Sequence, residues 1–209
     1  MATLMELLES FNRKERFFLI GDALGNRTFR LSSDFRAKIS KAFGIEPPIS
    51  AFVAMDYHLD WIHASLFLTQ QGNDDETVHM NTETVATGTQ EDIDLLIVFE
   101  VEDITHILLL EAKAATGWTN KQTLSKANRL ERIFGPDGAK YPRTKPHFGL
   151  MSPRPPKQLK SHCWPAWMTR DGQPIWLELK LPAGRRKVTR CDSRGRPSAE
   201  GAFFRALNC

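Results

Sequence analysis

The sequence predicts an α/β fold in which a mixed central sheet is flanked by helices and followed by a basic, β-rich C-terminal extension. Two apolar runs, residues 94–99 and 107–110, have the length and composition of short buried strands. The polar segment between them is short enough to join them as a hairpin. Other segments repeat apolar residues at intervals of three and four, which is typical of helices that cover a sheet.

The N-terminal part of the chain predicts helices. Residues 4–11 carry an apolar stripe, and a second helix is expected over residues 12–24, where Gly25 would end it. A short basic helix then begins at a Ser33 or Asp34 cap and runs to Gly44.

Residues 49–68 carry apolar side chains at alternating steps of three and four and predict an amphipathic helix. The second half, residues 61–68, is equally compatible with the first strand of the sheet. Asp56, His58 and Asp60 in this segment are residue types that bind metals, but polar residues spaced by two do not share one helical face. They are interpreted as packing and solvent-facing groups.

A further helix is predicted to begin at a Thr119 or Asn120 cap and to end near Phe134. Residues 147–151 follow it as a short core strand that adds to the sheet. The expected inner stripe of the helix consists of four apolar residues, Leu124, Ala127, Leu130 and Phe134. Its expected polar stripe consists of Lys121, Ser125, Asn128 and Arg132, flanked by Gln122 and Arg129.

Length and composition set outer limits on the class of protein. With 209 residues, 41% of them hydrophobic, the chain can bury a sizeable core as one domain with an appendage. We expect a core over residues 1–156 and a basic, aromatic-containing extension over residues 157–209 that packs on it. No segment approaches the roughly 18 apolar residues of a membrane span, and the start lacks a signal pattern. The expectation is a soluble, cytoplasmic protein.

Three cysteines, Cys163, Cys191 and Cys209, are widely spaced and form no Cys-x-x-Cys pair. Their odd number favours a reducing compartment over a disulfide framework. His162 beside Cys163 could contribute to a zinc site with Cys191, but a structural zinc takes four ligands, so a zinc site is disfavoured.

The net charge of +3 conceals an asymmetry between the two parts of the chain. Residues 1–119 contain 9 Lys and Arg against 19 Asp and Glu, whereas residues 120–209 contain 19 against 6. A basic region beside an acidic site suits a phosphate-backbone ligand, which cations attract. The alternative is that the two regions simply attract each other, and charge counts do not separate these readings.

Charged groups at the ends of the two apolar runs indicate chemistry. Glu111 and Lys113 share a face of their strand because side chains alternate. If Asp94 lies at the matching end of the neighbouring strand, two carboxylates and an ammonium meet. Two carboxylates repel each other, and a hard cation such as Mg²⁺, which binds one or two carboxylates together with phosphate oxygens, relieves that repulsion. This combination is suited to phosphodiester cleavage.

These residues resemble the motif of the PD-(D/E)xK nuclease superfamily, the restriction-endonuclease-like fold. Asp94 matches the motif aspartate, and Glu111, Ala112 and Lys113 match its ExK element, although Ile93 stands where a proline is usual. The following helix opens with Lys121 and Gln122. The resemblance covers about residues 10–150.

The resemblance implies a metal-dependent nuclease that leaves a 5′-phosphate. Asp94, Glu111 and the Ala112 carbonyl would bind Mg²⁺ or Mn²⁺, and Lys113 would position the attacking water. Glu15 matches the glutamate that many members carry on an early helix, although a local pair with a neighbouring base is the alternative reading.

A second Glu-x-Lys, formed by Glu178 and Lys180, ends another apolar run. Its nearest upstream acid, Asp171, belongs to a turn directly before that run, so no separate aspartate-bearing strand is available. This second element is interpreted as an edge strand with solvated charges.

Two basic surfaces are candidates for nucleic-acid contact. One is the polar stripe of the helix after Lys113, and the other is the basic C-terminal cluster. The candidate residues are Lys121, Gln122, Arg132, Arg185, Arg186, Lys187 and Arg190. Solvated helix faces look the same, and the nearby tryptophans and phenylalanines are read as core residues.

The sequence therefore predicts a metal-dependent nuclease that hydrolyses phosphodiester bonds, with DNA favoured over RNA. The alternative is a noncatalytic nucleic-acid-binding or assembly protein on the same fold. The resemblance also allows a homodimer. Endo- or exonucleolytic action and sequence preference are not determined by the residues.

Overall fold

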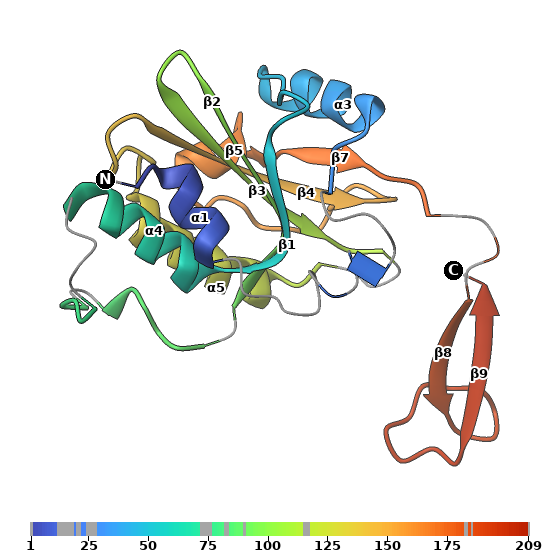
Figure 1. Ribbon diagram of the computed structural model, residues 1–209. Helices are drawn as coiled ribbons and strands as arrows, with labels where there is room; N and C mark the ends of the chain where they lie inside the picture. Colours follow the sequence, from blue (N-terminus) through green and yellow to red (C-terminus); the bar gives the residue numbers. More distant parts are fainter. Residues whose placement is uncertain are drawn as a thin grey trace.

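The protein is a mixed α/β structure built on a five-stranded sheet, with small two-stranded hairpins toward the C-terminus (Figure 1). The computed structural model describes residues 2–11, 19, 22–23, 29–71, 77–81, 84–89, 91–114, 118–181, 184 and 186–208. Within these ranges it contains four α-helices, α1 (Leu4–Phe11), α3 (Ser33–Phe43), α4 (Leu59–Gln71) and α5 (Asn120–Phe134). No described helix is long and apolar enough to cross a membrane.

The main sheet has the order β1-β2-β3-β4-β7. Its strands are β1 (Phe52–His58), β2 (Asp92–Val101), β3 (Ile104–Ala112), β4 (Thr144–Ser152) and β7 (Trp176–Glu178). β2 runs antiparallel to both of its neighbours, β1 and β3, whereas β3, β4 and β7 run parallel to one another. Helix α5 lies in the connection from β3 to β4, because parallel neighbours need a crossover connection. The predicted mixed sheet is confirmed.

The predicted hairpin of β2 and β3 is present and longer than its apolar runs. The two strands are joined by Glu102 and Asp103, both of which have positive φ, 51° and 61°. Positive φ at both central residues is the geometry of a type I′ turn, whose twist matches that of the flanking strands. This turn fixes the register that opposes Leu95 to Leu110.

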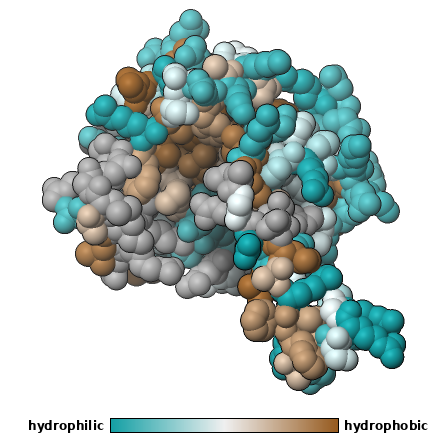
Figure 2. Space-filling view, turned by 90° about the vertical axis from the view of Figure 1, so that its right-hand side faces the viewer, coloured by the Kyte–Doolittle hydropathy of each residue, from teal (hydrophilic) through white to brown (hydrophobic). Residues whose placement is uncertain are grey.

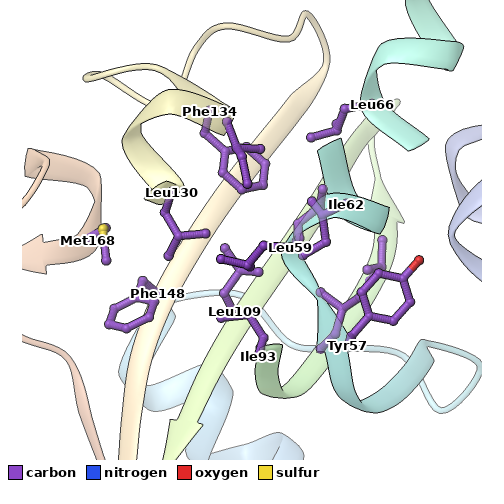
Figure 3. Close-up of a cluster of buried hydrophobic side chains, with 14 of the residues drawn as sticks. Tyr57, Leu59, Ile62, Leu66, Ile93, Leu109, Leu130, Phe134, Phe148 and Met168 are labelled. Carbon is purple, nitrogen blue, oxygen red and sulfur yellow. The ribbon is translucent and has the colours of Figure 1, made fainter. Parts of the chain in front are cut away.

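Both faces of the sheet are buried. Along β3, Ile107 and Leu109 point to the side covered by α1, α4 and α5, and Leu108 and Leu110 point to the side covered by α3. Figure 3 shows the first cluster, in which Leu109 lies among side chains from α4, α5 and β4. Because both faces are covered, the two runs are apolar at nearly every position.

The expectation for residues 49–68 is wrong in its order of elements. The first half forms strand β1, which pairs with β2 from Phe52 opposite Val98 to His58 opposite Asp92, and the second half belongs to α4. The apolar spacing fits both periods over so short a segment, and pairing with β2 decides in favour of the strand.

The helix ends agree closely with the sequence signals. Ser32, one residue before the expected cap, accepts a hydrogen bond from the Phe35 N–H, and Gly44 ends α3 in the left-handed conformation at φ 74°. Thr119 caps α5 as predicted. Leu124 is more than a third exposed, so its expected place in the inner stripe is wrong; buried Thr123 lies there instead.

The expected C-terminal extension is divided between two places. Strand β7 belongs to the main sheet, and β8 (Arg186–Cys191) pairs with β9 (Phe203–Asn208) as a separate hairpin. Figures 1 and 2 show this hairpin standing off the body of the protein. Two further short strands, β5 (Thr169–Arg170) and β6 (Gln173–Pro174), and the 3₁₀ helix η2 (Ala166–Met168) connect β4 to β7.

Candidate active site at the end of strand β3

The hairpin register brings Asp94 and Glu111 to the same end of their two strands. Leu95 lies opposite Leu110, so Asp94 and Glu111 follow as the next pair toward the strand ends. The Ala112 N–H donates a hydrogen bond of 2.6 Å to Asp94 Oδ2. The sheet therefore holds the two predicted acids beside each other.

Lys113 belongs to the same cluster. Glu111 and Lys113 alternate with Ala112 and thus continue the face of Ile107 and Leu109, which α5 covers. The Lys113 N–H donates to Met151 O at 2.9 Å, which anchors the backbone of Lys113 to β4. The Lys113 ammonium is close enough to Glu111 to lower the pKa of its carboxyl.

Lys126 on α5 completes the cluster and was not among the predicted site residues. Its Nζ lies 2.5 Å from Glu111 Oε1 and also donates to the backbone oxygen of Asp92. Both side chains of this ion pair are largely buried. A signal for Lys126 exists in the sequence, because Lys126 stands three residues after Thr123 and four before Leu130, on the inner stripe of the helix.

Burial raises the pKa of Glu111 to about 7. The positive charge of Lys126 opposes this rise in the pKa, and the negative charge of Asp94 adds to it. The charge of Lys113 also lowers the pKa of Glu111, by a smaller amount. A carboxyl whose pKa lies near 7 changes its charge in the physiological range, which is a frequent property of functional sites.

His58 and Asp92 form a second pair beside this cluster. His58 Nδ1 lies 3.1 Å from Asp92 Oδ1, and the His58 ring packs on Trp61 with a centroid distance of 4.2 Å. The side chain of Asp92 is thus directed to His58, which leaves Asp94 as the acid next to Glu111.

Arg129 joins three segments behind the site. Arg129 is 3% exposed. Its guanidinium pairs with Asp60 of α4, lies 3.7 Å from Glu91 Oε2 and donates to the hydroxyls of Thr87 and Thr89. The expectation that Arg129 flanks the exposed stripe of α5 is therefore wrong, because its position on the helix points inward. Asp60 is a packing group as interpreted, since it accepts hydrogen bonds from backbone N–H groups of the loop before β2.

The described residues supply two carboxylates and a backbone carbonyl to this cluster. Within them, no group of three or more His, Cys, Asp and Glu side chains is arranged to hold a metal ion. Glu15, the predicted third acid, lies outside the described residues. The N–H and C=O of one strand residue point toward the same neighbouring strand, so the Ala112 carbonyl faces the side of Asp94.

The predicted nucleic-acid contacts lie on two elements. Lys121, Gln122 and Arg132 are exposed on α5, as expected. Exposed residues of β8 from the same prediction are Arg186, Lys187 and Arg190. Arg185 lies outside the described residues.

The second Glu-x-Lys behaves as an edge strand, as interpreted. β7 is the last strand of the sheet, and both Glu178 and Lys180 are exposed. The Lys38 ammonium donates to the backbone oxygen of Glu178 at 2.7 Å.

Cys163 is exposed, whereas Cys191 is buried in the β8–β9 hairpin, and Cys209 lies outside the described residues.

No family model, curated protein or solved structure matches this chain. The function is therefore inferred from the geometry of the cluster itself.

Proposed function

We propose that this protein is a metal-dependent nuclease with a restriction-endonuclease-like fold that hydrolyses phosphodiester bonds, with DNA as the favoured substrate. The observation that carries the proposal is the convergence of Asp94, Glu111 and Lys113 at one end of the β2–β3 hairpin. The succession of that hairpin, helix α5 and the parallel strand β4 supports the resemblance to the PD-(D/E)xK nucleases.

The cluster fits a divalent cation. Glu111 is desolvated enough to raise its pKa to about 7, and the adjacent Asp94 contributes to that rise, so the two carboxyls favour a nearby positive charge. The Lys126 ammonium already supplies one such charge at Glu111 Oε1. Asp94, Glu111 and the Ala112 carbonyl would hold Mg²⁺ or Mn²⁺, with waters and a phosphate oxygen as further ligands.

A bound divalent ion would stabilise negative charge on the phosphate and lower the pKa of water. The protein's own contribution is a second positive charge on the same face. Lys113, one strand position beyond Ala112, would orient the attacking water through its ammonium and stabilise the charge that develops on the phosphate. Its backbone bond to Met151 holds this lysine at the strand end.

Helix α5 supplies both a buried and an exposed row of side chains for this reaction. Lys126 faces the carboxylates, whereas Lys121, Gln122 and Arg132 face solvent on the same helix. Contacts from such side chains to phosphate oxygens set the register of a nucleic acid without reading its sequence. We assign this exposed row to the substrate backbone.

The test is cleavage of DNA with Mg²⁺ or Mn²⁺ by single variants. Glu111→Ala and Lys113→Ala are expected to abolish cleavage while the protein stays folded. The second Glu-x-Lys provides matched controls, since Glu178→Ala and Lys180→Ala make the same changes at exposed positions and should leave cleavage intact. Wild-type activity in the Glu111 and Lys113 variants would remove the assignment.

A second candidate function is a noncatalytic nucleic-acid-binding protein on the same fold. The observation that favours it is the Lys126–Glu111 ion pair, which neutralises the site without any metal. Calorimetry separates the two: Mn²⁺ binding that disappears in Asp94→Ala supports the nuclease. Steeply salt-dependent DNA binding with no metal dependence supports the binding protein.

A further inference from the structure

The β8–β9 hairpin, called the arm below, stands off the body of the protein in both views (Figures 1 and 2). Its ladder runs from Arg186 opposite Asn208 to Cys191 opposite Phe203. An isolated two-stranded hairpin is marginally stable in water. A partner that covers the arm would therefore stabilise it.

The two faces of the arm differ in how fully their side chains are exposed. Residues that alternate along β8 and their cross-strand neighbours on β9 define a ribbon face of Arg186, Val188, Arg190, Phe204 and Ala206. Val188 is 69% exposed and Phe204 is 73% exposed. On the opposite face, Cys191 is buried and Thr189 and Arg205 are half-buried, whereas three residues are exposed, Lys187, Phe203 and Leu207. The ribbon face thus combines two guanidinium groups with exposed apolar side chains.

The charge of the arm is strongly positive. Residues 186–208 contain six Lys and Arg against two Asp and Glu. The surface is therefore complementary to a polyanion rather than to a membrane interior or to another basic copy of the arm.

We propose that the arm is a β-ribbon that binds double-stranded DNA by placing its ribbon face in the major groove. This rests on the proposed function, in which nucleic acid is the substrate. The major groove of B-DNA is about 12 Å wide and admits a two-stranded ribbon. Arginines reach phosphates and base edges there, and apolar groups such as Val188 and Phe204 contact thymine methyl groups. The deep, narrow major groove of an RNA duplex excludes such a ribbon.

The topology tethers the arm beside the candidate active site. β3, β4 and β7 run parallel, so their last residues, Ala112, Ser152 and Glu178, lie at the same end of the sheet. The chain leaves β7 at this end, and the seven residues from 179 to 185 span at most about 25 Å when extended. A duplex held by the arm therefore lies within reach of Glu111.

The far end of the arm is held in shape by its own contacts. Arg190 Nε donates to Gly201 O at 2.6 Å, and Asp192 Oδ1 accepts hydrogen bonds from two N–H groups of its loop. A Cβ on Gly201 would lie 2.0 Å from Cys191 O, so only glycine allows this close approach. The ribbon face is presented on a preorganised element, which reduces the entropy lost on binding.

The test measures binding of a 20-base-pair DNA duplex by fluorescence anisotropy in EDTA, so that no cleavage intervenes. The double variant Arg186→Ala with Phe204→Ser is expected to bind at least about tenfold more weakly and to lower the slope of log K against log salt by about 0.9, the value of one phosphate contact. The matched control, Arg205→Ala with Phe203→Ser, removes the same charge and ring from the opposite face and should bind within about twofold of wild type. Circular dichroism should be alike in all three proteins.

Equal binding by wild type and the ribbon-face variant would overturn the proposal, as would equal losses on the two faces. Arm-dependent binding of an RNA duplex of the same sequence would also contradict it. A wild-type dimer that the ribbon-face variant dissociates, with DNA affinity unchanged, would instead assign this face to self-association. Arm-dependent DNA binding by a chain that leaves DNA uncut with Mn²⁺ would support the arm and refute the nuclease.

Discussion

The Lys126 ammonium lies 2.5 Å from the Glu111 carboxylate, at the point where a divalent cation would bind in the proposed nuclease. This ion pair is largely buried, so its attraction is weakly screened by water and salt. In the proposed nuclease a divalent ion would therefore compete with a cation that belongs to the protein, and Lys126 would set how tightly the site binds metal.

Replacing Lys126 by Gln should tighten Mn²⁺ binding. The variant removes one positive charge from a site with two carboxylates, and a gain of at least about tenfold in affinity at pH 8 is expected, or ~1.4 kcal/mol. Isothermal calorimetry measures this directly. Lys121→Gln makes the same charge change on the exposed side of α5 and should alter the affinity little. Weaker Mn²⁺ binding in Lys126→Gln would show that this lysine supports the metal instead.

Metal affinity should depend on pH through Glu111. Burial raises the pKa of Glu111 to about 7, and only the ionised carboxylate binds a cation. Mn²⁺ affinity is expected to be about tenfold weaker at pH 6 than at pH 8, since one proton must leave this group. In Glu111→Gln the affinity should be weak and flat over this range. An equally flat profile in the wild type would exclude Glu111 as a ligand.

Asp60 should matter for stability, because Arg129 is buried against it. Asp60→Asn leaves the guanidinium with the more distant carboxylate of Glu91, 3.7 Å away, and breaking a buried pair costs up to about 3–5 kcal/mol. Urea denaturation gives the change in free energy of unfolding. Asp56→Asn is the matched control, since Asp56 is exposed and has φ 48°, which Asn tolerates. Comparable losses in both variants would contradict the role of the pair.

The acids and the lysine of the candidate site could be predicted because they depend on local rules. Alternation in a strand puts Glu111 and Lys113 on one face, and a tight turn between β2 and β3 aligns Asp94 with them. Lys126 could not be placed in the same way, because its contact with Glu111 depends on how α5 crosses the sheet. That crossing is determined by packing of the whole helix against β3 and β4.

The order of β1 and α4 shows the same limit. Apolar residues in 49–68 satisfy a helical spacing, yet Phe52–His58 is extended because β2 offers an open edge for pairing. No local signal in the segment carries that information. By contrast, both ends of α5 were predicted almost to the residue, because its Thr119 cap is a local signal that does not depend on the rest of the fold.

Two histidines at the other end of the sheet should control stability at mildly acidic pH. His106 Nδ1 lies 3.0 Å from His147 Nε2, and the rings stack with a centroid distance of 5.3 Å. Burial lowers the pKa of both, and the pKa of His147 falls to about 3 with further help from the charge of His106. A histidine in the unfolded chain has a pKa of about 6.5.

Between pH 6.5 and 3 the unfolded chain therefore binds a proton at His147 that the folded protein does not bind, and the free energy of unfolding falls as the pH falls. Glu111 acts in the opposite direction, because its raised pKa contributes stability below pH 4.5 that is lost as the pH rises through 7. The free energy of unfolding, plotted against pH below 6.5, should have a slope smaller by up to about 1.4 kcal/mol per pH unit in His147→Gln than in the wild type. Urea denaturation at pH 7, 6 and 5 measures the slope, with the exposed His162→Gln as the control. Identical slopes in wild type and His147→Gln would mean that this histidine is protonated in the folded protein as readily as in the unfolded chain.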